Sequence, residues 1–301
     1  MIASDPVRSD DLSSRLAQAS VEISSRGHQL AELCDNFAAG TDVTITFLPG
    51  DHYQHNVETA AALRRLGFNP VPHIAAREMA SRAALDDFFA RARGEADVRR
   101  VLLIAGDVAI AKGPFKSSHD IRASGLLEAH DFRSVSVAGH PEGHPFLDTP
   151  GTFAMLWAWG DWGRGRGIHV DIVTQFCFEA APILGFLDGL VMRGITVPVV
   201  VGLAGPASPA TLTKFALRCG IGNSMRALRA RIGRYGRLLT DTGPDEVFRG
   251  LLSAPRAATA PIAGFHLFPF GGLRKSAVWR RDFLEDLHRQ PKMPKLASQN
   301  P

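Results

Sequence analysis

The chain has 301 residues, a net charge of +4 and 45% hydrophobic residues, which is typical of a globular protein with a packed core. No apolar run approaches the ~20 residues that a membrane-spanning helix needs. The polar N-terminus lacks the apolar segment of a secretory signal. The three cysteines, Cys34, Cys177 and Cys219, are far apart and form no CxxC pair, which argues against a disulfide framework. The sequence therefore predicts a cytoplasmic protein without a membrane partner.

Part of the positive charge gathers near the C-terminus, and this cluster has two interpretations. A nucleic-acid-binding patch would interleave aromatic and basic residues, and no such interleaving accompanies the cluster. A solvated tail is therefore favoured, with no nucleic-acid partner, and an anionic small ligand would also suit a basic protein. The cluster consists of Arg274, Lys275, Arg280, Arg281, Arg289, Lys292 and Lys295.

Eight short runs rich in β-branched residues recur along the chain. Most are continuously apolar, which is typical of parallel strands that are buried on both faces. The predicted strands are 20–24, 42–47, 70–75, 101–105, 134–138, 170–175, 197–202 and 262–268.

Helical patterns separate these strands. Gly67 and Gly94 stand where helix C-caps are expected, and Ser208 followed by proline is a good N-cap. The predicted helices are 29–38, 57–66, 83–93, 182–192, 208–218, 224–238 and 244–252.

This alternation predicts a (β/α)8 TIM barrel over residues 19–289, with flexible segments at 1–18 and 290–301. The rival fold is an open, doubly wound sheet. That fold would normally carry a glycine-rich phosphate loop after its first strand, and the sequence has none.

Active sites of such barrels lie at the C-terminal ends of the strands, and several polar residues are expected there. Each also has a structural interpretation. Glu22 could be a surface carboxylate, Asp107 could cap a loop, Gln175 could satisfy backbone groups, and His73 and His266 could be hydrogen-bonded core residues. Together they indicate a functional site better than any one of them does.

His140 and His144 flank a carboxylate, Glu142, and so suggest a zinc site. However, prolines and a glycine interrupt the segment, so it cannot form the regular helix that would bring both imidazoles to one face. No third ligand is evident beyond Asp107 or Glu22. We therefore predict no metal.

The ordered set of strand-end motifs resembles the methylenetetrahydrofolate reductases. The match around residue 140 is the most specific, being similar to the family's Ser-Val-Ala-x-Tyr-Pro-Glu-x-His-Pro. The matching segments are SVE at 20–22, ITF at 45–47, PHI at 72–74, AGD at 105–107, SVAGHPEGHP at 136–145, TQFCF at 174–178 and GFHLF at 264–268.

The resemblance implies an FAD-dependent oxidoreductase of one-carbon metabolism. Hydride would pass from NADH or NADPH to FAD and then to 5,10-methylene-tetrahydrofolate, giving 5-methyl-tetrahydrofolate, or in the reverse, catabolic direction. The partners would be the folate and the nicotinamide dinucleotide. The sequence leaves open which dinucleotide is used and whether the chain forms a homo-oligomer.

The resemblance also implies residue roles. Glu22 would be the general acid that opens the methylene bridge, which requires a raised pKa. Asp107 would act in catalysis, bind the folate and contact the flavin, and Gln175 would bind the substrate. The implied flavin contacts are Thr46, Phe47, His73, Ala105, Gly106, Asp107, Ser117, Ser118, His140, His144, Trp157 and Arg164.

Several positions depart from the family pattern. Ala105 replaces an arginine, His140 replaces a tyrosine, and Ala210 stands where a phenylalanine usually stacks on folate. Between Trp157 and Arg164, only Arg164 retains a cation for the FAD phosphates. Three alternatives follow: a flavoprotein acting on another one-carbon or amine substrate, a barrel that binds folate or a partner protein without catalysis, and a metal-dependent hydrolase.

Overall fold

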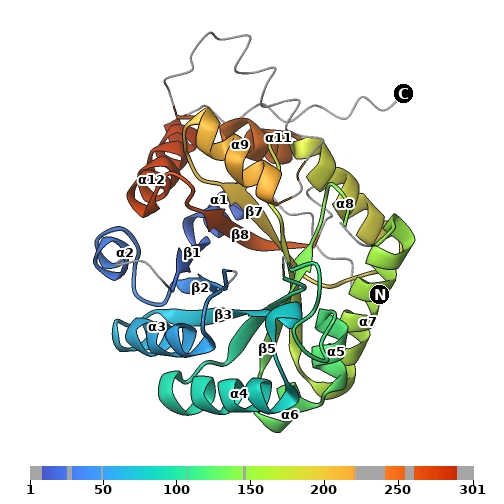
Figure 1. Cartoon of the computed structure of the whole chain (residues 1–301). Helices are drawn as coiled ribbons and strands as arrows, with labels where there is room; N and C mark the ends of the chain where they lie inside the picture. The colour runs from blue at the N-terminus through green and yellow to red at the C-terminus, as the bar shows by residue number, and fades with distance from the viewer. Residues whose placement is uncertain are drawn as a thin grey trace.

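The computed structural model describes residues 9–25, 29–48, 50–106, 108–144, 147–219, 221, 241–254 and 261–289. Its eight parallel strands form a closed barrel in chain order, with β1 pairing both β2 and β8 (Figure 1). The predicted (β/α)8 TIM barrel is confirmed, and the open sheet is excluded. None of the described helices is long and apolar enough to cross a membrane.

Each predicted strand is present, with ends that differ from the prediction by no more than two residues. The strands are β1 Ser20–Ser24, β2 Asp42–Thr46, β3 Asn69–Ala75, β4 Arg100–Ile104, β5 Ser134–Gly139, β6 His169–Thr174, β7 Val199–Ala204 and β8 Ile262–Phe268.

Helices surround the strands (Figure 1). They are α1 Ser9–Ala17, α2 Leu30–Asn36, α3 Tyr53–Arg65, η1 Ala76–Glu78, α4 Arg82–Ala96, α5 Ser118–Ala123, α6 Leu126–Ala129, α7 Thr149–Arg166, α8 Ala180–Met192, α9 Pro209–Arg218, α11 Asp245–Ser253 and α12 Leu273–Arg289.

The helix ends follow the capping residues, with one exception. Gly67, just after α3, has φ +85°, and the Ser208 side chain accepts from Thr211 N at the start of α9. Gly94, however, lies inside α4 and does not end it. The helix continues to Asp97, whose left-handed backbone (φ 44°) forms the cap. The predicted helix at 224–238 lies outside the described residues.

The N-terminal segment differs from its prediction. Residues 9–17 form α1, in which Leu12 and Leu16 are buried in the main core. These leucines pack the helix against the barrel. The prediction of a flexible segment over 1–18 is therefore wrong for residues 9–17. The C-terminal basic cluster is corrected in a similar way, because its residues up to Arg289 lie on α12, which buries Trp279 and Phe283.

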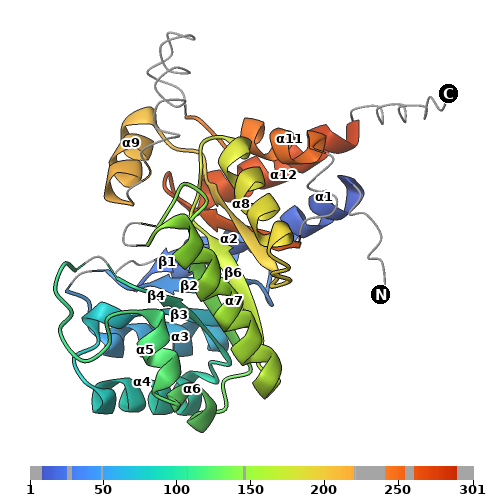
Figure 2. The ribbon, with the colours of Figure 1, turned by 90° about the vertical axis from the view of Figure 1, so that its right-hand side faces the viewer.

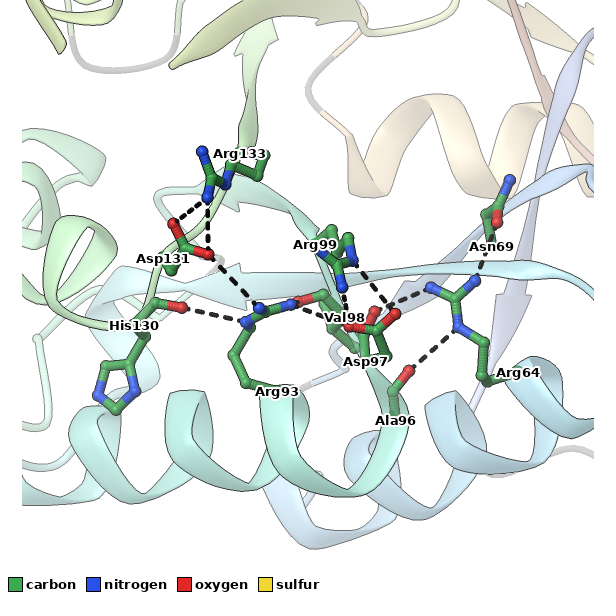
Figure 3. Close-up of polar contacts among 10 residues, drawn as sticks. All are labelled: Arg64, Asn69, Arg93, Ala96, Asp97, Val98, Arg99, His130, Asp131 and Arg133. Atoms are coloured by element: carbon green, nitrogen blue, oxygen red, sulfur yellow. Dashed lines mark hydrogen bonds and ion pairs between the residues drawn. The ribbon is translucent and has the colours of Figure 1, made fainter. Parts of the chain in front are cut away.

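Arginines fasten the N-terminal end of the barrel, where helices return to strands (Figure 3). Arg64 at the end of α3 donates to the carbonyls of Ala96 (3.2 Å) and Asp97 (2.9 Å), and Arg93 on α4 donates to the His130 carbonyl (3.1 Å). These bonds satisfy backbone groups that the ends of the helices leave without partners. They link successive connections at this end of the barrel, while the loops at the other end carry the candidate site.

Side-chain alternation divides β1 between the core and the barrel interior. Val21 and Ile23 point outward and are buried against the surrounding helices. Ser20, Glu22 and Ser24 therefore point into the barrel. The same alternation on the other strands leaves two cavities inside the barrel, one near each end.

Candidate functional site

A pocket of about 200 Å³, which we call the mouth pocket, opens at the C-terminal ends of the strands. Its walls are mainly apolar, with a few polar groups that converge on the centre, as in many sites for small molecules. It brings together six of the residues selected from the sequence: Glu22, Thr46, Phe47, His73, His140 and Gln175.

Glu22 supplies the carboxyl group of this pocket. Its side chain is mostly buried, and burial raises its pKa to about 7. The nearby Thr46 hydroxyl, which donates to the Ile23 carbonyl at 3.0 Å, favours the carboxylate but offsets the effect of burial only in part. Glu22 therefore holds its proton up to about pH 7, within the range in which a general acid can act.

Two histidines lie inside the barrel near Glu22. His73 Nε2 is 3.6 Å from Glu22 Oε2, and burial lowers the pKa of His73 to about 4. Burial, with smaller contributions from His73 and Arg100, lowers the pKa of His266 to about 3. Both imidazoles are thus neutral at pH 7, and Glu22 and His73 form a neutral contact instead of an ion pair.

These pKa values predict how stability depends on pH. Between about pH 5 and 6 the folded chain holds one proton on Glu22, whereas the unfolded chain holds nearly two, on His73 and His266. These groups therefore make the free energy of unfolding rise by about 1.4 kcal/mol per pH unit in this window. In Glu22→Gln the opposing proton is gone, so we expect their contribution to the slope to double. Urea unfolding from pH 5 to 6 measures both slopes, and equal slopes would contradict the assignment.

Aromatic side chains form one wall of the mouth pocket. Phe215 on α9 stacks on Phe270 (4.2 Å between centroids, 19°). Phe270 also stacks on Phe268 and makes an edge contact with Phe176. The sequence comparison placed Ala210 where a stacking phenylalanine was expected, but α9 presents Phe215 to the pocket instead. The spacing of Phe215 and Cys219, one helical turn apart, is the sequence signal that could have identified this face.

Gln175 and His140 also line the mouth pocket. The Gln175 side chain accepts from Phe176 N at 3.1 Å, so it satisfies a backbone group and also faces the cavity. Burial lowers the pKa of His140 to about 4, and its ring lies edge-on to His144 at 4.6 Å. The interrupted His140–His144 segment forms a turn and not a helix. Among the described residues, no group of three His, Cys, Asp or Glu side chains could hold a metal ion.

Other predicted residues do not line the mouth pocket. Ser117 caps α5 and bonds to Asp120, Ser118 is buried, and Gly106 packs against Ala75 with φ +92°. Ala105 uses its carbonyl to accept from Arg77 N. Asp107 lies outside the described residues.

The two residues predicted on α7 also lie away from the pocket. Trp157 is half exposed, and Arg164 pairs with Asp161 at 3.5 Å. Arg164 is in the last turn of α7, roughly 22 Å along the axis from its first residue at a rise of ~1.5 Å per residue. Because α7 runs back from the end of β5 to the start of β6, Arg164 belongs to the N-terminal end of the barrel.

The described residues fit only part of FAD. The stacked phenylalanines and neutral imidazoles suit a flat heterocycle. A diphosphate needs cations or free helix N-termini. Arg218 is the one cation among the described lining residues, and the Asp148 side chain already accepts from Gly151 N at the start of α7. With a single cation among the described lining residues, the mouth pocket offers little to hold the FAD diphosphate, and we assign no chemical step to the flavin.

Comparison with known proteins supports the fold. No family model matches the chain. A solved structure of an uncharacterised protein from Clostridium thermocellum, described as binding two copies of 5-methyl-5,6,7,8-tetrahydrofolic acid, is similar with a TM-score of 0.56 and 11% sequence identity. The match covers 91% of this chain and 99% of that chain. At this identity, the similarity concerns the fold alone.

Proposed function

We propose that this chain binds a reduced folate in the mouth pocket and interconverts 5,10-methylene-tetrahydrofolate and 5-methyl-tetrahydrofolate. The observation that carries the proposal is the buried Glu22 carboxyl, whose pKa burial raises to about 7, in an otherwise mainly apolar pocket. The folate ligand of the structurally similar clostridial protein and the ordered strand-end motifs support the same substrate class.

The chain's own residues would supply position and a proton. The Phe215–Phe270 wall would hold the flat rings of the folate, and Gln175 would offer hydrogen bonds to their polar edge. Glu22 would donate its proton to the bridging nitrogen as the methylene bridge opens, and would take it back in the reverse reaction. The resemblance assigns the hydride to NADH or NADPH acting through FAD, and both cofactors remain predictions.

Turnover of the purified protein tests this function. We expect 5,10-methylene-tetrahydrofolate and NADH or NADPH to give 5-methyl-tetrahydrofolate, identified by mass spectrometry. Parallel reactions with and without FAD determine whether the flavin is needed. Failure to convert or bind either folate, with the protein folded, would contradict the proposal.

A folate-binding barrel without catalysis is the second candidate. The poor fit of the described residues to the FAD diphosphate favours it, because a reductase of this family would need that cofactor. It predicts that 5-methyl-tetrahydrofolate binds in a calorimetric titration, whereas none of the turnover reactions converts a folate. A bound flavin that is reduced without any effect of folate would instead indicate a flavoprotein with another substrate.

A further inference from the structure

A line of polar side chains runs inside the barrel beside β1, and we call it the axial stripe. Barrels of this fold usually fill these layers with branched apolar residues. Here Glu22 is in register with Thr44, and Ser20 is in register with His266. Beside these polar residues, Val71, Leu102 and Val173 form an apolar cluster in the interior. The axial stripe consists of Glu22, His73, Thr44, His266 and Ser20.

Close contacts join two pairs of residues in the stripe. His73 Nε2 lies 3.6 Å from Glu22 Oε2, and His266 Nδ1 lies 2.9 Å from Ser20 Oγ. His73 is also close enough to His266 to lower its pKa. Within the part of the chain that the structure describes, both ring nitrogens of His73, Nε2 of His266 and the Thr44 hydroxyl have no hydrogen-bond partner. Such buried polar atoms call for water or a functional role.

The stripe leads to a second cavity, of about 290 Å³, at the N-terminal end of the barrel. Ser20 and Thr44 line this cavity, whereas Glu22 and His73 line the mouth pocket. Leu102 and Val173 line both cavities, so one layer of side chains separates them. Phe215 on α9 lines the mouth pocket, and Arg15 on α1 lines the second cavity. Figure 2 shows α9 and α1 on opposite sides of the strands.

Charged groups gather at the far end of the stripe. Arg100 pairs with Asp42 at 2.9 Å and with Asp171, and His169 Nε2 is 3.6 Å from Asp171 Oδ2. Arg15 lines the same cavity but is already paired with Asp11. The stripe itself carries no fixed positive charge, because both imidazoles are neutral. A neutral imidazole has one N–H donor and one nitrogen acceptor, so it can pass on a proton while it receives another.

We propose that the axial stripe conducts protons between Glu22 and the solvent of the N-terminal cavity while a ligand covers the mouth pocket. The inference rests on the proposed function, in which Glu22 loses a proton to a bound folate. The His73 N–H donates its proton to the Glu22 carboxylate. His73 then takes up a proton from His266. His266 takes up a proton from the Ser20 hydroxyl, and that hydroxyl takes up a proton from water. Each group gives up one proton and gains one, so a single proton moves from solvent to Glu22 and nothing is oxidised.

Hydrogen–deuterium exchange of the Glu22 carboxyl tests the path. At pH 6 the protonated carboxyl gives an infrared C=O band, identified by its loss in Glu22→Gln. The protein, with and without saturating 5-methyl-tetrahydrofolate, is moved rapidly into D2O. We expect the wild type to exchange rapidly in both states. Ser20→Ala should exchange as fast as wild type when the mouth is open, and at least tenfold more slowly when folate covers it.

Three further variants serve as controls for the Ser20 result. Ser20→Thr keeps a hydroxyl beside His266 and should restore rapid exchange with folate bound. Ser136→Ala removes a hydroxyl that contacts Arg100 at 3.0 Å, at the same end of the barrel but outside the stripe, and should exchange like wild type. His266→Leu interrupts the stripe independently and should slow exchange as Ser20→Ala does.

The outcomes separate the path from the proposed function. If folate binds and Ser20→Ala and His266→Leu still exchange at the wild-type rate, the path is wrong and the folate site stands. If 5-methyl-tetrahydrofolate does not bind to the wild type, the proposed function fails and this role of the stripe fails with it.

Discussion

Glu22→Gln should lower kcat for 5,10-methylene-tetrahydrofolate reduction by roughly 10²- to 10⁴-fold, the range expected for loss of a positioned general acid. Glutamine is close in size and is neutral like the protonated carboxyl, so the pocket keeps its shape. It cannot donate an acidic proton to the bridging nitrogen. Because 5-methyl-tetrahydrofolate needs no such proton in order to bind, we expect its Kd to change by less than about threefold. Steady-state kinetics and a calorimetric titration measure the two effects.

The control for this variant is Glu58→Gln, the same chemical change on the exposed face of α3. It should keep wild-type kcat and Kd. Full reductase activity in Glu22→Gln would remove the acid role. A parallel loss of activity and folate binding would show that the substitution had damaged the pocket and not the proton transfer.

Arg100→Met should destabilise the folded chain by about 3–5 kcal/mol, the cost of leaving a buried charge without its partner. Arg100 bridges Asp42 and Asp171 at the N-terminal end of the barrel, and only 3% of the Asp171 side chain is exposed. Methionine fills a similar volume but removes the guanidinium, which leaves the buried Asp171 carboxylate with the exposed His169 at 3.6 Å. The free energy of unfolding in urea at pH 7 measures the loss.

Two variants separate the buried charge from general damage to the cavity. Arg15→Met changes an arginine that lines the same cavity but pairs with Asp11 near the surface, and it should cost less than about 1 kcal/mol. Adding Asp171→Asn to Arg100→Met removes the unpaired charge and should recover part of the stability. A loss below 1 kcal/mol in Arg100→Met would show that the Asp171 carboxylate is solvated or protonated in the fold.

The sequence predicted the strands well for a physical reason. Parallel strands buried on both faces require continuous apolar runs, and the run at 262–268 coincides with β8. Helix ends were less certain where a glycine lies inside a helix, as Gly94 does in α4. The α1 helix was missed because its exposed polar residues mask Leu12 and Leu16, which become buried only against the folded barrel.

The sequence could predict only those residues of the candidate site that lie at the end of a single strand. Glu22 and Gln175 follow from strand ends and from the motifs that surround them. The spacing of Phe215 and Cys219 identifies the face of α9 that they share, but the packing of that face over the mouth follows only from the folded barrel. The partners of Arg100 come from β2 and β6, far away in the chain, so their pairing follows from barrel closure alone. Arg164 was expected at the barrel mouth because the sequence does not show how far along α7 it lies or in which direction that helix runs.

The protonation state of Glu22 in the mouth pocket is the central claim, and a pH titration of its infrared carboxyl band tests it most directly. The band is assigned by its loss in Glu22→Gln and followed from pH 4 to 9, with and without 5-methyl-tetrahydrofolate. We predict a midpoint near pH 7 that shifts when the folate binds. A midpoint near the ordinary value of 4.5, unchanged by folate, would contradict both the buried acid and the folate site built around it.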